Sequence, residues 1–294
     1  QSLWEGVETV HIGPFLPYSL AVRKATHLIC PGGSLLQNKT SNRSLLLYLS
    51  VINAFTQSGK KAFMLNQGIG PINGKFWEKR TRDTISRLTL FSARDRRTAM
   101  WVSESLPKEK VLLSSDAAFA APRESTPGEA SSQRYEYGFI VRGDVRSIIL
   151  SSPQFPPPDR FIIGVMQVDE WRNPRRIERL GRRLDGATLE LKDAESFVKE
   201  IGACQVVFTE RYHGLVAALL AMVPFVGIGS DPKIASFCNE CDMPCYSEPR
   251  ITLDELRQLK REAVERFKKE AFEERILEFR RRHETQRAIL AEIL

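Results

Sequence analysis

Long hydrophobic runs are missing from this chain of 294 residues. No run approaches the roughly 20 apolar residues that a bilayer-spanning helix needs, and the longest, at 215–228, is interrupted by Pro224 and Gly227. The first five residues lack the basic and apolar regions of a signal peptide, and the chain does not begin with Met. We therefore expect a cytoplasmic protein with no secretory signal, and we expect further residues upstream of Gln1.

Cysteine is also scarce. The five cysteines show no paired spacing, which favours a reducing compartment over a disulfide framework. Cys238, Cys241 and Cys245 form a Cys-x2-Cys-x3-Cys pattern that zinc could use, but no fourth ligand is evident nearby, and Cys204 precedes a predicted buried strand. We therefore expect ordinary thiols and no metal site.

The chain has no internal repeat and no low-complexity tract. Its content of 42% hydrophobic and 27% charged residues excludes a disordered chain, a collagen-like repeat and a disulfide miniprotein. The length corresponds to about two domains. The net charge of +7 is mild and leaves phosphorylated small molecules, anionic lipid and nucleic acid open as partners.

Predicted strands and helices alternate along most of the chain, which indicates βαβ units and parallel sheets. We predict an α/β fold with one domain at 1–133, a second at 134–250 and amphipathic C-terminal helices at 251–294. A segment rich in Pro, Gly and Ser at 121–134 is the predicted linker. The predicted strands are 26–30, 61–66, 88–93, 111–114, 137–141, 161–166, 206–209 and 225–228. The predicted helices are 44–58, 76–88, 174–184, 194–201 and 214–222. A further helix is predicted to begin at 94–96, and one or two more are predicted within 253–294.

Polar and glycine residues follow the predicted strands of the first domain, at the sheet edge where open parallel sheets bind ligands. Pro31-Gly32-Gly33-Ser34 and Gln67-Gly68-Ile69-Gly70-Pro71 offer backbone N–H groups to an anion or a sugar hydroxyl, or are simply tight turns. Asp95 and Asp116 are either ligand-binding groups or helix N-caps, with Arg94 beside the first of them. The candidate binding residues of this domain are Gly32, Gly33, Ser34, Gln67, Gly68, Gly70, Arg94, Asp95 and Asp116.

The second domain carries the strongest catalytic candidates. Arg211, His213 and Lys233 follow consecutive predicted strands, and the 20 residues between His213 and Lys233 match one strand–helix–strand crossover. Arg grips carboxylate and phosphate in bidentate fashion, and Lys adds a point charge. The other histidines are expected in a loop, inside a strand and on a helix surface, at positions 11, 27 and 283. Further candidate binding residues are Arg142, Gly214, Ser230 and Asp231.

Six motifs in order resemble the polysaccharide pyruvyl transferase family over 26–245. The run 32–49 is especially similar to the bacterial branch that modifies the cell-wall polysaccharide anchoring S-layer proteins. The other motifs are Gln67-Gly68-Ile69-Gly70-Pro71, Ser92-Ala93-Arg94-Asp95, Asp116-Ala117-Ala118-Phe119, Arg211-Tyr212-His213 and Ser230-Asp231-Pro232-Lys233.

This resemblance implies two Rossmann-like domains facing a cleft, in a GT-B-like arrangement, with the active site in the cleft. It implies transfer of the pyruvyl group of phosphoenolpyruvate onto two hydroxyls of an amino sugar in a lipid-diphosphate-linked saccharide. Arg211, His213 and Lys233 would be catalytic, with phosphoenolpyruvate as donor substrate and no cofactor. The family's usual first strand and Asn-x-Gly-Asp-like loop are absent, so we expect a truncated first domain, and the segment 142–211 is shorter than in the family.

Two other functions stay open, a nucleotide-sugar glycosyltransferase of the same architecture and a non-catalytic binding relative.

The positive charge of the chain is unevenly distributed. Residues 1–133 carry 17 Lys and Arg against 10 Asp and Glu, so the whole charge excess lies in the first domain, while the 254–294 tail has 11 Lys and Arg against 10 Asp and Glu. This distribution favours a peripheral, lipid-diphosphate acceptor at the inner face of the plasma membrane over nucleic acid.

Overall fold

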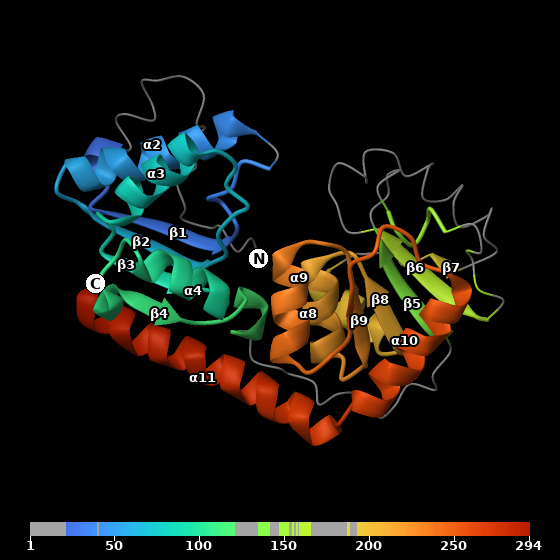
Figure 1. The fold of residues 1–294 in the computed structure, drawn as a ribbon. Helices are drawn as coiled ribbons and strands as arrows, with labels where there is room; N and C mark the ends of the chain where they lie inside the picture. The colour runs from blue at the N-terminus through green and yellow to red at the C-terminus, as the bar shows by residue number, and fades with distance from the viewer. Residues whose placement is uncertain are drawn as a thin grey trace. The chain divides into compact units, whose positions relative to one another are not determined.

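The computed structural model describes residues 22–39, 41–120, 135–141, 147–152, 155, 157, 159–165, 187–188 and 193–294, and every structural statement below refers to these residues. The chain forms two compact units, each shown in Figure 1. The first comprises Gln1–Ala117 with Arg282–Leu294, and the second comprises Ala118–Arg281. Arg142, the whole linker predicted at 121–134, and the helix predicted at 174–184 lie outside the described residues.

The first unit contains a parallel sheet in the order β1-β2-β3-β4. Its sequential order confirms the strand–helix alternation predicted for this part of the chain. The strands are β1 (His27–Gly33), β2 (Lys61–Gln67), β3 (Leu90–Ala93) and β4 (Val111–Leu113), and the α-helices between them are α2 (Asn42–Gln57), α3 (Lys75–Ile85) and α4 (Arg96–Ser103). Short 3-10 helices lie at Lys108–Lys110 and Ala117–Phe119.

Helix α2 shows how the sequence sets the first unit's packing. The Ser41 hydroxyl accepts a hydrogen bond from the backbone N of Arg43 at 3.1 Å and caps the helix. Leu45, Leu49, Ile52 and Phe55 recur at helical spacing and are buried. Leu46, one residue after Leu45, is 36% exposed, because a step of one residue rotates a side chain by about 100° around the helix.

The second unit contains a six-stranded parallel sheet in the order β10-β9-β8-β5-β6-β7. From β5 the chain builds the sheet in one direction and from β8 in the other, so the strand order reverses between these two neighbours. Such a reversal is where open α/β sheets bind ligands. The strands are β5 (Tyr135–Val141), β6 (Phe161–Val165), β7 (Ala187–Thr188), β8 (Cys204–Thr209), β9 (Phe225–Ile228) and β10 (Cys245–Tyr246).

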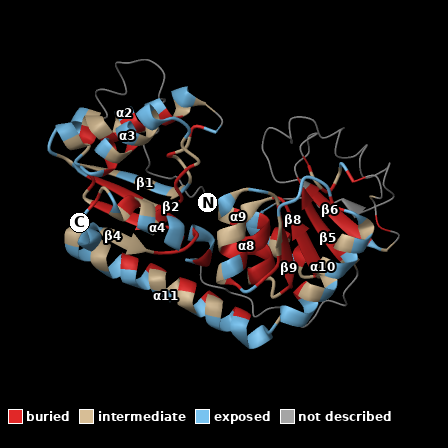
Figure 2. Ribbon diagram, in the orientation of Figure 1, coloured by how far each residue is buried: buried red, intermediate tan, exposed pale blue. Residues whose placement is uncertain are grey.

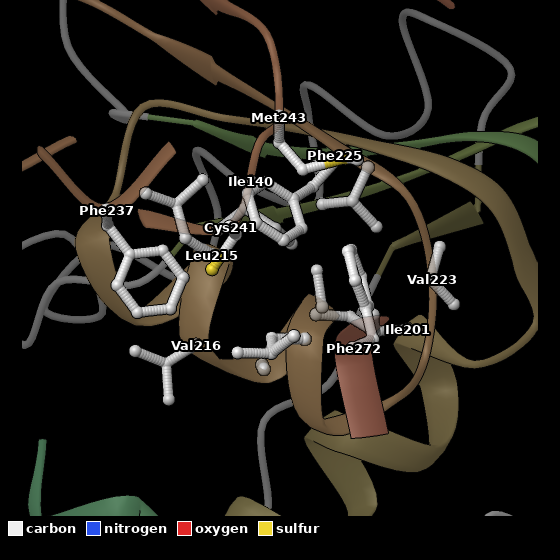
Figure 3. Packing of buried hydrophobic residues seen from close by; sticks show 14 of the residues in the cluster. Ile140, Ile201, Leu215, Val216, Val223, Phe225, Phe237, Cys241, Met243 and Phe272 are labelled. Carbon is white, nitrogen blue, oxygen red and sulfur yellow. The ribbon is translucent and has the colours of Figure 1, made fainter. Parts of the chain in front are cut away.

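One apolar helix lies at the centre of the second unit's core. Helix α8 (Tyr212–Leu220) buries every residue from Gly214 to Leu219, which is typical of a helix that is apolar all round. It packs with α7 (Ala194–Ile201), α9 (Pro232–Glu240) and the start of α11 (Lys269–Ile293) around Phe225, as Figure 3 shows for the labelled side chains. On the other side of the sheet, α10 (Leu253–Arg266) buries Leu256 and Ala263. Helix α9 and strand β10 were not among the predicted elements.

Helix α11 contributes to both units. Phe272, Ile276 and Phe279 belong to the second unit's core, and His283 and Gln286 are each 6% exposed in the first unit. The spacing of 4, 3, 4 and 3 residues places all five on one face, and Figure 2 shows buried positions recurring along the helix. The prediction of His283 as a helix-surface residue is therefore wrong. No helix within the described ranges is long and apolar enough to cross a membrane.

Candidate functional site

The side chain of Gln67 fastens the turn that follows β1. Gln67 is fully buried, and its Oε1 accepts a hydrogen bond from the backbone N of Leu35 at 3.3 Å. Its Nε2 donates to the carbonyl oxygens of Cys30, at 3.2 Å, and Gly32. Gly32 and Gly33 adopt φ values of 53° and 91°, which glycine reaches without steric cost. The glycines of this motif therefore form a tight turn that a neighbouring buried amide supports.

Three other predicted site residues of the first unit meet around Arg94, which is 4% exposed. Its Nη2 donates to Ser34 Oγ at 3.1 Å, and its Nη1 lies 3.4 Å from Asp116 Oδ2. A Cβ atom on Gly68 would lie 2.6 Å from Arg94 Nη2 and 2.9 Å from Ser34 Oγ, so only glycine leaves room for this contact. These residues follow β1, β2, β3 and β4 in turn, so one charged cluster joins the carboxyl ends of all four strands.

Asp95 caps helix α4. Its Oδ1 accepts a hydrogen bond from the backbone N of Thr98 at 2.8 Å, and the Thr98 hydroxyl accepts from the backbone N of Ile69 at 3.2 Å. Gly70, with φ of 73°, donates from its backbone N to the Leu36 carbonyl at 3.0 Å. Of the alternatives that the sequence left open for Asp95, the structure thus contains the helix cap.

A second polar cluster in the first unit was missed at the sequence level. Asn66, in the left-handed region at φ 55°, donates from Nδ2 to Ser114 Oγ at 2.9 Å and to the Ser115 carbonyl at 3.0 Å. Gln286 donates to Asn66 Oδ1 at 3.2 Å, and His283 Nε2 lies 2.9 Å from the Asp116 carbonyl. Helix α11 therefore fixes the backbone of Asp116, whose side chain pairs with Arg94.

His283 sits in this cluster as a neutral imidazole. The Asp116 carbonyl oxygen can only accept, and it lies 2.9 Å from His283 Nε2, so Nε2 carries a proton and donates it. His283 Nδ1 faces the amide nitrogen of Asn66 at 3.4 Å. Burial lowers the pKa of His283 below its ordinary 6.5, although the Asp116 carbonyl and carboxylate partly oppose this shift. Protonation would place two N–H donors, from His283 and Asn66, against each other.

The first prediction concerns the pH dependence of stability. Folding lowers the pKa of His283, so below pH 6.5 the unfolded state binds more protons than the folded state. The stability that neutral His283 contributes is therefore fully present above pH 6.5, and it is lost as the pH falls through the folded pKa. Urea unfolding of the wild type and of His283→Gln, measured from pH 8 to pH 5, should give a wild-type advantage that shrinks on acidification. An advantage that stays constant over this range would contradict the assignment.

In the second unit, β8 ends at Thr209, next to β5 at the point where the strand order reverses. The Thr209 hydroxyl accepts from the backbone N of Arg211 at 3.0 Å and donates to the Arg211 carbonyl at 2.9 Å. This small turn places Arg211 at the N-cap of α8, with His213 exposed in the first helical turn. The predicted catalytic residues Arg211 and His213 thus stand at the amino end of a helix and the carboxyl end of a strand.

Gly214 allows α8 to approach the sheet closely. A Cβ atom at this position would overlap Thr209 Oγ1, would lie 2.9 Å from Thr209 Cβ and would lie 3.3 Å from Ile140 Cβ on β5. The absence of a side chain therefore sets the distance between the helix that carries His213 and the strands beneath it.

The second prediction follows from this contact. Gly214→Ala should lower the free energy of unfolding by about 1–3 kcal/mol, because overpacking a buried position forces the helix and strand apart. Chemical denaturation would measure the loss. Ala217→Gly, which removes a methyl group from the same helix, provides a cavity control. Wild-type stability in Gly214→Ala would show that the helix start has room to shift.

Lys233 follows the neighbouring strand of the same sheet. Strands β8 and β9 are paired with Thr209 opposite Gly227, so Lys233 on α9 is carried by the strand beside the one that precedes Arg211. The Asp231 side chain accepts from the backbone N of Lys233 at 3.1 Å and caps α9. Ser230 is exposed and Lys233 is half-buried. Within the second unit, the three predicted catalytic residues therefore follow two adjacent strands at one sheet edge.

Glu210 is a buried carboxylate in this motif that sequence reasoning did not select. It is 3% exposed, and its Oε1 accepts from Ser147 Oγ at 3.0 Å and from the backbone N of Ile149 at 3.1 Å. Its backbone N donates to the Ile140 carbonyl at 2.8 Å. Glu210 thereby ties the segment after β5 to the end of β8. A lone acid between a buried strand and an Arg was the signal that could have identified it.

The thiols of Cys238 and Cys245 lie close to the backbone of Gly227. An added Cβ there would lie 2.5 Å from Cys238 Sγ and 3.6 Å from Cys245 Sγ. The hydrogen bond from the Cys238 thiol lowers the pKa of Cys245, while burial opposes the shift. Among the described residues, no group of three or more His, Cys, Asp or Glu side chains is arranged to hold a metal ion.

Comparisons with known proteins relate the chain to one sequence family and one fold. A family model described as polysaccharide pyruvyl transferase matches residues 7–232. No curated protein sequence gives a significant match. Among solved structures, UDP-GlcNAc 2-epimerase from Neisseria meningitidis bound to UDP-GlcNAc has a TM-score of 0.60 at 12% identity, covering 94% of this chain and 79% of that one.

Two further structures agree with this fold. Anabaena HepE in complex with UDP has a TM-score of 0.58 at 13% identity, covering 95% of this chain and 82% of that one. UDP-N-acetylglucosamine 2-epimerase from Rickettsia bellii has a TM-score of 0.55 at 12% identity, covering 97% of this chain and 81% of that one. At these identities the likeness shows the fold alone, and it confirms the prediction of a GT-B-like α/β fold with a long C-terminal helix.

Proposed function

Because the chain belongs to the polysaccharide pyruvyl transferase family, we propose that it transfers the pyruvyl group of phosphoenolpyruvate to a sugar of a lipid-linked cell-wall saccharide. The product would be a cyclic ketal that bridges two sugar hydroxyls, and inorganic phosphate would be released. Phosphoenolpyruvate is the donor substrate in this scheme, which requires no further cofactor.

The observation that carries the proposal is the placement of Arg211, His213 and Lys233 after adjacent strands, beside the reversal of strand order between β5 and β8. Phosphoenolpyruvate carries a carboxylate and a phosphate. Arg211 would bind one of these groups in bidentate fashion, Lys233 would neutralise the other, and the amino end of α8 would add its positive dipole. Arg142, which follows β5 in the chain, is proposed as a further cation.

His213 is proposed as the group that moves the proton. C3 of the enol gains a proton to become the methyl group while one sugar hydroxyl attacks C2 and loses its own proton. The resulting ketal phosphate then expels phosphate, and the second hydroxyl closes the ring. His213 suits this work because it is exposed and an imidazole can both accept and donate a proton.

The side chains of the acidic candidates are already engaged in structural hydrogen bonds and ion pairs. The Asp95 and Asp231 side chains cap helices, and Asp116 is paired with Arg94. These contacts leave His213 as the preferred proton carrier of the sequence candidates.

The first unit is proposed to hold the acceptor. The charge excess of the chain lies within residues 1–133, and a lipid diphosphate at an anionic membrane surface would be attracted to it. The proposed partners are therefore phosphoenolpyruvate and an amino-sugar saccharide on a lipid diphosphate, met at the inner face of the plasma membrane.

Ligand-dependent thermal stability separates this proposal from its alternatives. Stabilisation by phosphoenolpyruvate, together with phosphate release when a saccharide acceptor is added, is the expected result. Stabilisation by UDP or UDP-GlcNAc without any effect of phosphoenolpyruvate would favour a nucleotide-sugar enzyme. Phosphoenolpyruvate binding without turnover on any acceptor would indicate a non-catalytic relative.

A further inference from the structure

A hollow of about 200 Å³ lies in the first unit between the loop at 69–72 and helix α4. Its other lining residues are Glu78 from α3 and Arg97, Thr98 and Trp101 from α4. The volume is below the roughly 300–1,000 Å³ of pockets for drug-sized ligands, so the hollow suits a single small ring. It lies beside the carboxyl ends of β2 and β3, next to the Gly68–Arg94 contact.

The loop that forms one wall is held by hydrogen bonds to the segment at 36–38. Gly70 donates from its backbone N to the Leu36 carbonyl at 3.0 Å, and Asn38 donates to the Pro71 carbonyl at 3.2 Å. The Asn38 side chain also accepts from the backbone N of Asn73 at 2.6 Å and donates to its carbonyl at 2.9 Å. This wall is therefore formed before any ligand binds.

The opposite wall is an indole held by an ion-paired arginine. The Arg82 guanidinium lies 4.0 Å from the centre of the Trp101 ring. It is 3.0 Å from Glu78 and 3.0 Å from Glu104. Arg82 does not line the hollow, so it supports Trp101 without occupying the space.

The hollow presents one acceptor and one array of donors. Both hydrogen bonds that Arg82 makes to Glu78 go to Oε1, and Oε2 accepts from no other described residue. Arg97 is exposed and makes no hydrogen bond or ion pair with the residues that the structure describes. A carboxylate oxygen and a guanidinium thus line a space that also has an aromatic wall and the apolar side chains of Ile69 and Ile72.

We propose that this hollow binds a neutral pyranose unit of the saccharide acceptor. A sugar ring offers an apolar face to Trp101 and hydroxyls that can donate to Glu78 and accept from Arg97. Arg97 and the supporting Arg82 carry two positive charges, and Glu78 and Glu104 carry two negative charges, so this group has no net charge. A site without net charge suits an uncharged ligand rather than a phosphate or carboxylate. This inference rests on the proposed function, since it names where the acceptor of that reaction is held.

The test uses the purified chain and two independent measurements. In the first, Arg97→Ala and Glu78→Gln should each raise the KM for a saccharide acceptor about tenfold, from the loss of a hydrogen bond to a charged group, and leave the KM for phosphoenolpyruvate unchanged. Arg96→Ala is the matched control, because Arg96 is exposed on the same helix turn but does not line the hollow.

The second measurement does not need turnover. Saturation-transfer NMR with the methyl glycosides of N-acetylmannosamine, N-acetylglucosamine and glucose should give a signal with the wild type and Arg96→Ala that Arg97→Ala weakens. Equal signals with the wild type, Arg96→Ala and Arg97→Ala would overturn the inference, and so would displacement of the glycosides by inorganic phosphate. Glycoside binding by a wild type that releases no phosphate would support the hollow while rejecting the proposed reaction.

Discussion

Replacing His213 by alanine is expected to lower phosphate release from phosphoenolpyruvate plus acceptor by about 10²- to 10⁴-fold, the usual contribution of one general acid or base. The loss should appear in kcat, because the proton is moved in the transition state rather than in the bound ground state. Steady-state phosphate release at saturating phosphoenolpyruvate measures it. His213 is exposed in the first turn of α8, so its removal should leave the free energy of unfolding unchanged within about 0.5 kcal/mol.

Lys233 supplies a comparison at the same sheet edge. Lys233→Ala should chiefly raise the KM for phosphoenolpyruvate, because the lysine is proposed to neutralise an anionic group in both the ground state and the transition state. Lys199→Ala is the matched control, since Lys199 is an exposed lysine of the same unit on α7. Near-normal turnover in His213→Ala would remove this histidine from the mechanism.

Asp116→Ala is expected to cost about 3–5 kcal/mol in the free energy of unfolding, because it leaves the buried Arg94 guanidinium without its carboxylate. The side chains of Arg94 and Asp116 are only 3% and 9% exposed, and the two are 3.4 Å apart. The Asp116 carbonyl that binds His283 is backbone and survives the substitution. Urea unfolding monitored by circular dichroism measures the loss.

A double variant distinguishes an uncompensated charge from a lost packing contact. Arg94→Met combined with Asp116→Leu removes both charges and should recover much of the stability lost in Asp116→Ala, since an apolar pair of similar volume often replaces a buried ion pair at little cost. A loss below about 1 kcal/mol in Asp116→Ala would mean that solvent or another group already compensates Arg94.

The sequence was most informative where apolar runs alternate with turns. Strand β8 and helix α8 are recognisable because their apolar residues are nearly continuous, and such runs belong to buried elements. The positions of Arg211 and Lys233 after neighbouring strands followed from the crossover length alone. The adjacency of β5 and β8, which places the reversal of strand order there, could not be predicted because strand order depends on long-range pairing.

The largest error concerns a polar residue on a buried face. His283 was predicted on a helix surface, but His283 and Gln286 continue the buried stripe begun by Phe272, Ile276 and Phe279. They are buried because Asn66, Ser92 and the Asp116 carbonyl satisfy their hydrogen bonds. Only the spacing of 3 and 4 residues along the helix carried this information.

Several candidate binding residues have a structural explanation of their own. Gly32 and Gly33 form a left-handed turn, and Gln67 supports that turn from the interior. Gly68 gives space to Arg94. These contacts make the loops rigid, and rigid loops at a sheet edge are what a binding site requires, so a structural role and a role in binding are compatible here.

The central claim is that the chain forms a pyruvyl ketal from phosphoenolpyruvate, and product analysis tests it most directly. The purified protein would be incubated with phosphoenolpyruvate labelled with ¹³C at C2 and C3 and with a panel of lipid-diphosphate amino-sugar acceptors. We predict labelled ketal methyl and quaternary carbons attached to the saccharide by NMR, in equal amount to the phosphate released. His213→Ala should slow the appearance of both by the same factor, about 10²- to 10⁴-fold. Phosphate release with the label in free pyruvate, or label incorporation by His213→Ala at the wild-type rate, would contradict the account.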